Sequence, residues 1–169
     1  MKARQSHLFT IGHSTRSAEN FVALLKARGV ETLVDVRSFP GSRRHPQFGK
    51  DALRAMLAEA GIDYIHMVSL GGRRNTQDVA VHDTHWRNPA FANYADYART
   101  EPFRTGLSEL EALARKRPVA IMCAEAVWWR CHRRIIADEL LKDGFAVTHI
   151  MGPGRDEAAK PESEPELPL

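Results

Sequence analysis

The sequence predicts an α/β fold, a single three-layer domain in which a mostly parallel sheet of about five strands is flanked by helices. Two observations support this prediction. Short apolar segments of strand length alternate along the chain with amphipathic segments of helical period, which is typical of a parallel sheet covered by helices. The chain has 169 residues, 43% of them hydrophobic, which is enough for one domain with its own core.

Five apolar segments are expected to form the strands. The clearest is Val119–Cys123, whose length and β-branched residues are typical of a strand buried on both faces. The order of the strands in the sheet does not follow from the sequence. The expected strands are Leu8–Ile11, Glu31–Val36, Ile62–Val68, Val119–Cys123 and Ala146–Ile150.

Helices are expected between these strands. Ser17 is a predicted N-cap, and Phe21, Leu24 and Leu25 share one face of a helix that Gly29 ends. The other expected helices are Asp51–Ala60, Phe91–Arg99, Phe103–Ala114 after the break at Pro102, and one after the Val119 strand that carries Ile135, Ile136, Leu140 and Leu141.

Two segments show neither the alternation of a strand nor the apolar spacing of a helix. The polar segment from Gly71 to Ala90 is expected to be a functional lid or a disordered loop, because structureless stretches of that length are uncommon inside compact domains. Residues 153–169 are rich in Pro and Glu, and we expect them to form a disordered tail after a domain of residues 1–152. The tail is expected to make no core contacts.

The charge is unevenly distributed. Residues 153–169 carry a net charge of −3. Because the whole chain has a net charge of +3, the remaining body of the chain carries +6. Arginine makes up 18 of the 24 basic residues, and its planar fork suits phosphate and carboxylate, although an Arg-rich genome would give the same ratio. No apolar segment approaches the ~20 residues of a membrane span, and none resembles a signal-peptide core. Two cysteines are too few for a disulfide scaffold. We therefore expect a cytoplasmic protein with no membrane partner.

Polar side chains that can act as acids, bases or anion ligands follow four of the expected strands. Ligands of such sheets bind outside the carboxyl ends of the strands, so these side chains are expected to share a pocket. The candidate catalytic residues, which supply acids and bases, are His13, Asp35, Glu125 and His132. The candidate anion-binding residues are Ser14, Arg37, Arg43, Arg73, Arg130 and Arg133.

Several of these residues also have a purely structural interpretation. Asp35 and Arg37 project to the same side of a strand end, and they could form an ion pair that fixes a loop. His132 shares a helix face with Ile136 and Leu140, and it could be a partly buried core histidine. The sequence leaves both alternatives open.

Cys123 and Cys131 lie on either side of a turn between a strand and a helix. Their spacing does not match zinc sites, so we expect no metal and no other cofactor. Thiol phosphatases and sulfur transferases place a cysteine in such a loop, but the carboxylate of Glu125 would raise the pKa of Cys123 and disfavour it as a nucleophile. A redox pair needs the two Cα atoms within ~7 Å of each other. The sequence does not establish that distance.

Several short motifs, taken in order, resemble the domain of unknown function 488 family. They are Ile11-Gly12-His13-Ser14, Val34-Asp35-Val36-Arg37 with Pro40 and Ser42-Arg43, Leu70-Gly71-Gly72, Cys123-Ala124-Glu125, Cys131-His132-Arg133 and His149-Ile150. The resemblance runs from about Leu8 to Met151. It implies that the motif residues belong to a shared pattern, but it implies no activity, because the family is named for lacking an established one.

The leading hypothesis for function is an enzyme that hydrolyses or transfers a group of an anionic, phosphate-bearing substrate, such as a nucleotide or a nucleic acid. One alternative is a non-catalytic nucleic-acid-binding module, which the basic body and the arginines beside tryptophans support. Another is a thiol or redox protein that uses Cys123 and Cys131. The mixture of acids, bases and cations at the strand ends favours the enzyme.

Overall fold

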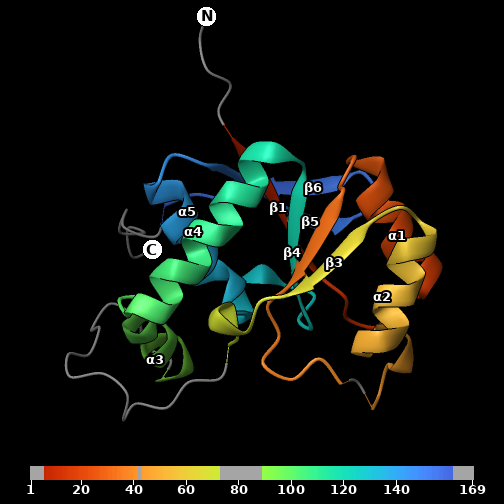
Figure 1. Cartoon of the computed structure of the whole chain (residues 1–169), viewed down its shortest axis with the longest axis horizontal. Coiled ribbons are helices and arrows are strands. Elements are labelled where there is room, and N and C mark those ends of the chain that lie inside the picture. The colour runs from red at the N-terminus through yellow and green to blue at the C-terminus, as the bar shows by residue number, and fades with distance from the viewer. Residues whose placement is uncertain (1–5, 42, 73–88, 162–169) are drawn as a thin grey trace, which may run out of the picture.

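A six-stranded sheet lies at the centre of the fold (Figure 1). The computed structural model describes residues 6–41, 43–72 and 89–161. The strands are β1 (His7–Gly12), β2 (Thr32–Asp35), β3 (Asp63–His66), β4 (Val119–Cys123), β5 (Ala146–Gly152) and β6 (Arg155–Ala158). Their order across the sheet is β3-β2-β4-β1-β5-β6, with β1 to β5 parallel and β6 antiparallel to β5.

Helices cover both faces of this sheet. They are α1 (Ala18–Ala27), α2 (Lys50–Glu59), α3 (Pro89–Tyr97), α4 (Glu101–Lys116) and α5 (Arg133–Lys142), with short 3-10 helices η1 (Pro46–Phe48), η2 (Val68–Leu70) and η4 (Trp128–Arg130). Figure 1 shows α1 and α2 on one side of the sheet and α3, α4 and α5 on the other. The predicted three-layer α/β fold is confirmed. None of the helices in the described residues has the length and apolarity that a membrane span requires.

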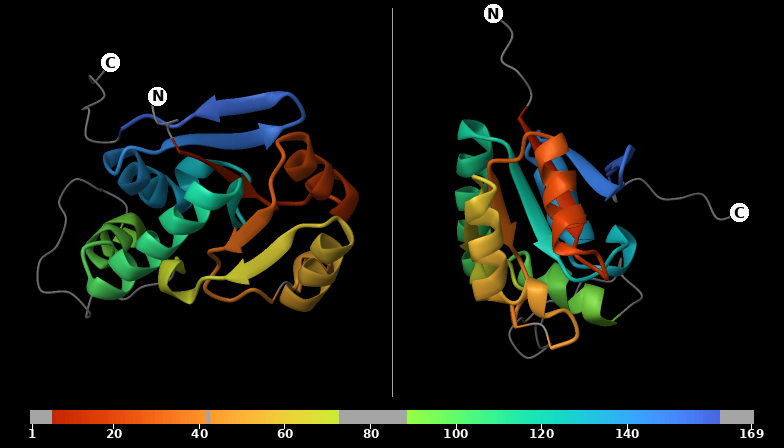
Figure 2. Two further views of the ribbon diagram at one scale, coloured as in Figure 1. Left: turned by 45° about the horizontal axis from the view of Figure 1, so that its top comes forward. Right: turned by 90° about the vertical axis from the view of Figure 1, so that its right-hand side faces the viewer.

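Each face of the sheet buries its own apolar core. Successive side chains of β4 alternate between the faces, so that Ile121 packs toward α3, α4 and α5 while Met122 packs toward α1 and α2. All five residues of β4 are buried, which explains why this strand is a continuous apolar run in the sequence. The right-hand view of Figure 2 looks onto the side of the sheet that α1 and α2 cover.

The parallel register brings the carboxyl ends of three strands to one level. Gly12 of β1 pairs with Cys123 of β4, and Asp35 of β2 pairs with Met122 of β4. The loops that leave β1, β2 and β4 therefore start side by side at one edge of the sheet. This edge carries the candidate site.

The helix boundaries agree with the sequence prediction except near Pro102. Ser17 is the N-cap of α1, and its side chain accepts a hydrogen bond from the backbone N–H of Asn20 at 3.1 Å. Pro102 lies in the first turn of α4, where backbone N–H groups have no partner within the helix. The helix therefore begins before the expected Phe103, because proline is compatible with this position.

The structure corrects the predicted tail at its start. Residues Arg155–Ala158 form the edge strand β6. The indole N–H of Trp128 donates to the Glu157 carboxylate at 2.8 Å, and Ala159 packs against the core. Composition could not show this strand, because backbone pairing with β5 holds it instead of apolar side chains. Residues 162–169 of the expected tail lie outside the described residues.

Gly12, at the end of β1, is a position where the fold leaves no room for a side chain. A Cβ there would lie 1.6 Å from the carbonyl oxygen of Glu125. We expect Gly12→Ala to lower the free energy of unfolding by about 2 kcal/mol or more, because the backbone must move to make room. Gly152→Ala is the control, since a Cβ at that position in β5 meets nothing within 4 Å. Urea unfolding compares the two variants, and equal stabilities would contradict the expectation.

Candidate functional site

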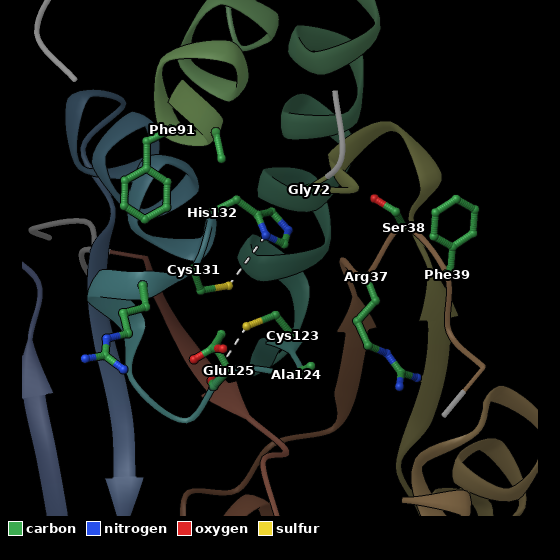
Figure 3. A pocket seen from close by; sticks show the side chains of 12 residues that line it. Arg37, Ser38, Phe39, Gly72, Phe91, Cys123, Ala124, Glu125, Cys131 and His132 are labelled. Atoms are coloured by element: carbon green, nitrogen blue, oxygen red, sulfur yellow. Dashed lines mark hydrogen bonds between the residues drawn. The ribbon is translucent and has the colours of Figure 1, made fainter. Parts of the chain in front are cut away.

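A pocket of 320 Å³ lies at the carboxyl ends of β2 and β4 (Figure 3). Its titratable and cationic lining residues come from the loops after these two strands and from the segment just before α5. They are Arg37, Cys123, Glu125, Arg130, Cys131 and His132. Figure 3 shows the rings of Phe39 and Phe91 at opposite sides of the pocket. The strand ends thus gather thiols, cations and a histidine that are far apart in the sequence.

Asp35 is completely buried and forms an ion pair with Arg37. The Nε and Nη2 groups of Arg37 donate to the Asp35 carboxylate at 2.9 and 2.8 Å. The hydroxyl of Tyr64 donates to the same carboxylate at 2.6 Å. Asp35 does not line the pocket, whereas Arg37 does. The geometry therefore makes Asp35 the group that orients Arg37, and the structural ion pair is present.

His13 is buried behind Arg37. Its Nδ1 lies 3.0 Å from the carbonyl oxygen of Ser14, which can only accept, so Nδ1 carries the proton. Its Nε2 lies 3.5 Å from Nη1 of Arg37, and its ring stacks on Phe48 with 4.5 Å between centroids. Burial lowers the pKa of His13 to about 4, the hydrogen bond to Ser14 opposes this, and the charge of Arg37 lowers the pKa further. His13 is therefore neutral at pH 7 and supports Arg37 from outside the pocket.

Cys123 and Cys131 are free, buried and in direct contact through their thiol groups. Figure 3 shows the two sulfur atoms close together in the pocket. Burial and the interaction with Cys131 raise the pKa of Cys123, which therefore keeps its proton. Burial also tends to raise the pKa of Cys131, but the hydrogen bond from Cys123 and the charge of Arg133 outweigh it and lower this pKa to about 7.

Arg133, the first residue of α5, is the buried cation beside these thiols. Its Nη1 donates to the hydroxyl of Thr10 at 3.0 Å, and its Nη2 donates to the carbonyl oxygen of Glu125 at 2.7 Å. Within the described part of the chain, no carboxylate pairs with it and its Nε has no hydrogen-bond partner. Burial lowers the pKa of Arg133, but the two thiols more than offset this and raise it. The thiols are thus its electrostatic partners.

His132 is oriented by a backbone contact toward the thiols. Its Nε2 donates to the carbonyl oxygen of Val36 at 2.7 Å, which leaves the lone pair of Nδ1 directed at Sγ of Cys131, 3.5 Å away. The ring packs so closely on Gly72 that a Cβ there would lie 2.5 Å from Nδ1. It also lies against the ring of Tyr94, with 5.0 Å between centroids. His132 is therefore both packed, as the structural interpretation has it, and part of the pocket.

Glu125 contacts the buried groups through its backbone. Its carbonyl oxygen accepts from Arg133 and lies 3.7 Å from Sγ of Cys123, while the residue is exposed. The sequence argument that this carboxylate raises the pKa of Cys123 is therefore wrong about the cause. Burial and Cys131 raise it instead. The direction of a loop side chain is decided by packing, which the sequence does not show.

The remaining predicted anion-binding residues are dispersed. Ser14 follows His13 in the left-handed region, at a φ of 47°, and serves through its backbone. Arg43 is exposed and does not line the pocket. Arg130 is exposed at the pocket wall. Arg73 lies outside the described residues, with most of the expected lid.

Sequence reasoning missed a buried polar group of side chains on the α5 face of the sheet. The hydroxyl of Thr10 lies 2.6 Å from Nδ1 of His149, and the ring of Trp128 stacks on His149 with 4.7 Å between centroids. Burial lowers the pKa of His149 to about 3, and the charge of Arg133 contributes to this. The available signal was a threonine and a histidine inside otherwise apolar strands.

The donors at this edge suit thiol and acid–base chemistry. No cluster of three or more His, Cys, Asp or Glu side chains that could hold a metal ion occurs in the described residues. The two thiols with His132 and Arg133 can instead hold a negative charge on sulfur, and Arg37 with Arg130 can hold one on a ligand.

A comparison with known families adds one match. Residues 17–140, well over half of the chain, match the family described as "Domain of unknown function DUF488". The chain belongs to this family. No curated protein and no solved structure matches the chain. The DUF488 match includes Arg37, both cysteines, His132 and Arg133, and it begins after His13.

The ion pair between Arg37 and Asp35 predicts a large stability effect. Arg37→Ala is expected to lower the free energy of unfolding by ~3–5 kcal/mol, because it leaves the Asp35 carboxylate buried and without its cation. Tyr64→Phe, which removes one hydrogen bond to the same carboxylate, is the matched control and should cost less, about 2 kcal/mol. Chemical unfolding of both variants makes the comparison. An Ala variant as stable as the unmodified protein would show that the pair is not structural.

The buried neutral histidines predict a loss of stability in acid. The pKa of His13 is about 4 in the folded protein, below the ordinary value of about 6.5 that holds when unfolded. The unfolded chain therefore binds the proton first, so this stability is fully present above pH ~6.5 and is lost as pH falls toward the folded value.

His13→Gln is expected to reduce the slope of unfolding free energy against pH by ~1.4 kcal/mol per pH unit between about pH 6 and pH 4.5. His149, with a pKa of about 3, contributes a slope of the same sign that remains in this variant. Urea unfolding at several pH values measures the slopes. An unchanged slope would mean that His13 takes up its proton in the folded state as easily as in the unfolded chain.

Proposed function

We propose that this protein is an enzyme that hydrolyses or transfers a group of an anionic, phosphate-bearing substrate, with the Cys131 thiolate as its nucleophile. The observation that carries the proposal is the position of Arg133. This guanidinium is fully buried, it has two thiols beside it, and no carboxylate among the described residues neutralises it. A protein interior tolerates such a cation only with an anionic or strongly polar partner.

The Cys131 thiolate is the partner that the local geometry supports. The backbone N–H of Arg133 lies 3.4 Å from Sγ of Cys131, at the start of α5, where unpaired N–H groups and the helix dipole favour negative charge. The interaction with the neighbouring thiol of Cys123 also lowers its pKa. These contacts lower the pKa of Cys131 to about 7, so a large fraction of the thiol is deprotonated at neutral pH.

The cations of the pocket support an anionic substrate. Arg37 uses Nε and Nη2 on Asp35, while its Nη1 lies on the side of His13 and the residue lines the pocket. Arg130 adds a second, exposed cation at the pocket wall. The rings of Phe39 and Phe91 supply apolar contacts for the rest of a substrate such as a nucleotide.

The chemistry consists of two displacements. In the first, the sulfur of Cys131 attacks the electrophilic phosphorus or carbonyl carbon of the substrate, a bond to sulfur forms, and the leaving group departs with its electron pair. In the second, water or an acceptor alcohol attacks the thioester or thiophosphate, and the thiolate leaves with the electron pair of the sulfur bond. The exposed carboxylate of Glu125 lies at the pocket and can take the proton of that water. Nδ1 of His132, next to sulfur, can hold the thiol proton between cycles.

The expected catalytic roles of Asp35 and His13 change in this proposal. Both are buried and neither lines the pocket, so they act as positioning residues that hold Arg37. A cytoplasmic location belongs to the same proposal, since two free thiols in contact persist best in a reducing compartment.

A non-catalytic nucleic-acid-binding module has less support. Such a module would spread its cations over a surface, whereas the arginines of this edge include two buried ones, Arg37 and Arg133. A buried thiolate would also repel a phosphate, because both are negatively charged.

Alkylation kinetics test the nucleophile. In Cys123→Ser, which leaves Cys131 as the single thiol, the rate of modification by iodoacetamide should rise with pH around a midpoint below the ~8.5 of an ordinary thiol, because Arg133 remains. Adding Arg133→Met should move this midpoint up by at least about one unit, toward the ~8.5 of an ordinary thiol. Adding Arg133→Lys, which keeps the charge, should move it less. A midpoint that does not respond to Arg133→Met would contradict the proposal.

Protection by phosphate tests the anion pocket on the same Cys123→Ser protein. Inorganic phosphate should slow alkylation of Cys131, and adding Arg130→Ala should weaken this protection by roughly tenfold. Arg43→Ala is the matched control, because Arg43 is a nearby exposed arginine outside the pocket. Incubation with acetyl phosphate should leave an acetyl or phosphoryl group on Cys131 after acid quenching. Equal protection in the Arg130 and Arg43 variants would contradict the assigned pocket.

A further inference from the structure

The contact between Cys123 and Cys131 has a consequence beyond nucleophilic group transfer. The two thiols come from separate elements, the end of β4 and the turn before α5, and both line the pocket. The two thiols interact electrostatically, Figure 3 shows their sulfur atoms close together, and both cysteines are free. A second thiol is not needed for a displacement at phosphorus or carbon. It is needed for a reaction that ends in a disulfide.

The surroundings of the two sulfur atoms differ. Sγ of Cys131 meets the backbone N–H of Arg133 at 3.4 Å and Nδ1 of His132 at 3.5 Å. Sγ of Cys123 lies 3.7 Å from the carbonyl oxygen of Glu125. This oxygen accepts a hydrogen bond from the thiol but cannot stabilise a thiolate. Sγ of Cys131 thus has a backbone donor and a base, Nδ1 of His132, that can take its proton, whereas an acceptor faces Cys123. This arrangement makes Cys131 the attacking sulfur and Cys123 the resolving sulfur.

We infer that Cys123 and Cys131 form a redox-active pair, in which Cys131 reacts with a hydroperoxide and Cys123 resolves the product to a reversible intramolecular disulfide. The inference rests on the reactive Cys131 of the proposed function and adds a second class of substrate and a second role for the pocket. Oxidation removes the nucleophile, so the oxidised protein has no group-transfer activity until a thiol reductant restores it.

The oxidation of the pair by a hydroperoxide has two steps. The thiolate of Cys131 attacks one oxygen of the hydroperoxide, the O–O bond breaks, and the departing alkoxide or hydroxide takes a proton from solvent, which leaves a sulfenic acid on Cys131. The sulfur of Cys123 then attacks the sulfur of Cys131. The S–S bond forms and the S–O bond breaks, and the hydroxide leaves with the proton of the Cys123 thiol as water. Two sulfur atoms are each oxidised by one electron, and the peroxide is reduced by two.

The buried guanidinium explains why the disulfide would be reversible. A disulfide carries no negative charge, so its formation leaves Arg133 without its electrostatic partner among the described residues. An uncompensated buried charge is costly, and that cost falls on the oxidised form alone. Reduction returns the thiolate to Arg133. The pair is therefore expected to be reduced readily by a small dithiol.

The experiment treats the reduced full-length protein with hydrogen peroxide and then follows intact mass and peptide maps. The expected product is a monomer that has lost two hydrogens, with Cys123 linked to Cys131 in one peptide pair, and that dithiothreitol restores. In Cys123→Ser the sulfenic acid should persist on Cys131 and react with dimedone. In Cys131→Ser, oxidation of Cys123 should be slower by at least about tenfold, because the remaining thiol keeps its proton. Circular dichroism confirms that each variant is folded.

The outcomes separate this inference from the proposed function. Direct over-oxidation of Cys131 to sulfinic acid without any disulfide would overturn the redox pair, even if acetyl phosphate still modifies Cys131. Disulfide formation in a protein whose Cys131 is never modified by acetyl phosphate would overturn the proposed group transfer and leave the pair standing. Faster oxidation of Cys131→Ser than of Cys123→Ser would reverse the assigned roles and overturn the inference as stated.

Discussion

A buried positive charge, the guanidinium of Arg133, is the constraint on which the site depends. It is buried near the turn between β4 and α5. It donates hydrogen bonds to the carbonyl oxygen of Glu125 in that turn and to the hydroxyl of Thr10 in β1, and so connects the turn to β1. Removing a guanidinium from water is costly unless strong partners replace the water. The protein meets this cost with backbone and hydroxyl oxygens and with two thiols. The lowered pKa of Cys131 follows from that charge balance.

The two buried arginines of this edge are neutralised in different ways, and the difference assigns their roles. Arg37 has a carboxylate partner, Asp35, so its charge is compensated within the protein, and the residue also lines the pocket. Arg133 has no carboxylate partner in the described residues, so its charge acts on the thiols. In the proposed function, Arg37 holds a substrate group and Arg133 stabilises the Cys131 thiolate. Gly12 allows the close backbone approach of β1 to Glu125, in the connection between β4 and α5.

Much of the fold and part of the site could be predicted from local pattern. The apolar run of β4 and the N-cap Ser17 are visible in the sequence because strand burial and helix capping depend on residues close together in the chain. The position of Arg37 at a pocket follows from the rule that parallel strands end at one edge. Strand β6 was missed because an edge strand is held by backbone pairing, which leaves little trace in composition. Arg133 was predicted to bind an anion, but its burial beside two thiols was not, since a charged residue at a helix start is usually exposed.

The sequence by itself determined the three-layer α/β fold, the family and the set of polar residues that follow the strands, because periodicity, turn residues and short motifs are local properties of the chain. Only the tertiary structure decided which of these residues meet. It placed Asp35 and His13 behind Arg37, brought the backbone of Glu125 against Arg133, and brought Cys123 close to Cys131. The reason is that strand order and side-chain direction depend on how distant segments pack. Burial, ion pairing and the charge on a thiol are all set by those through-space distances.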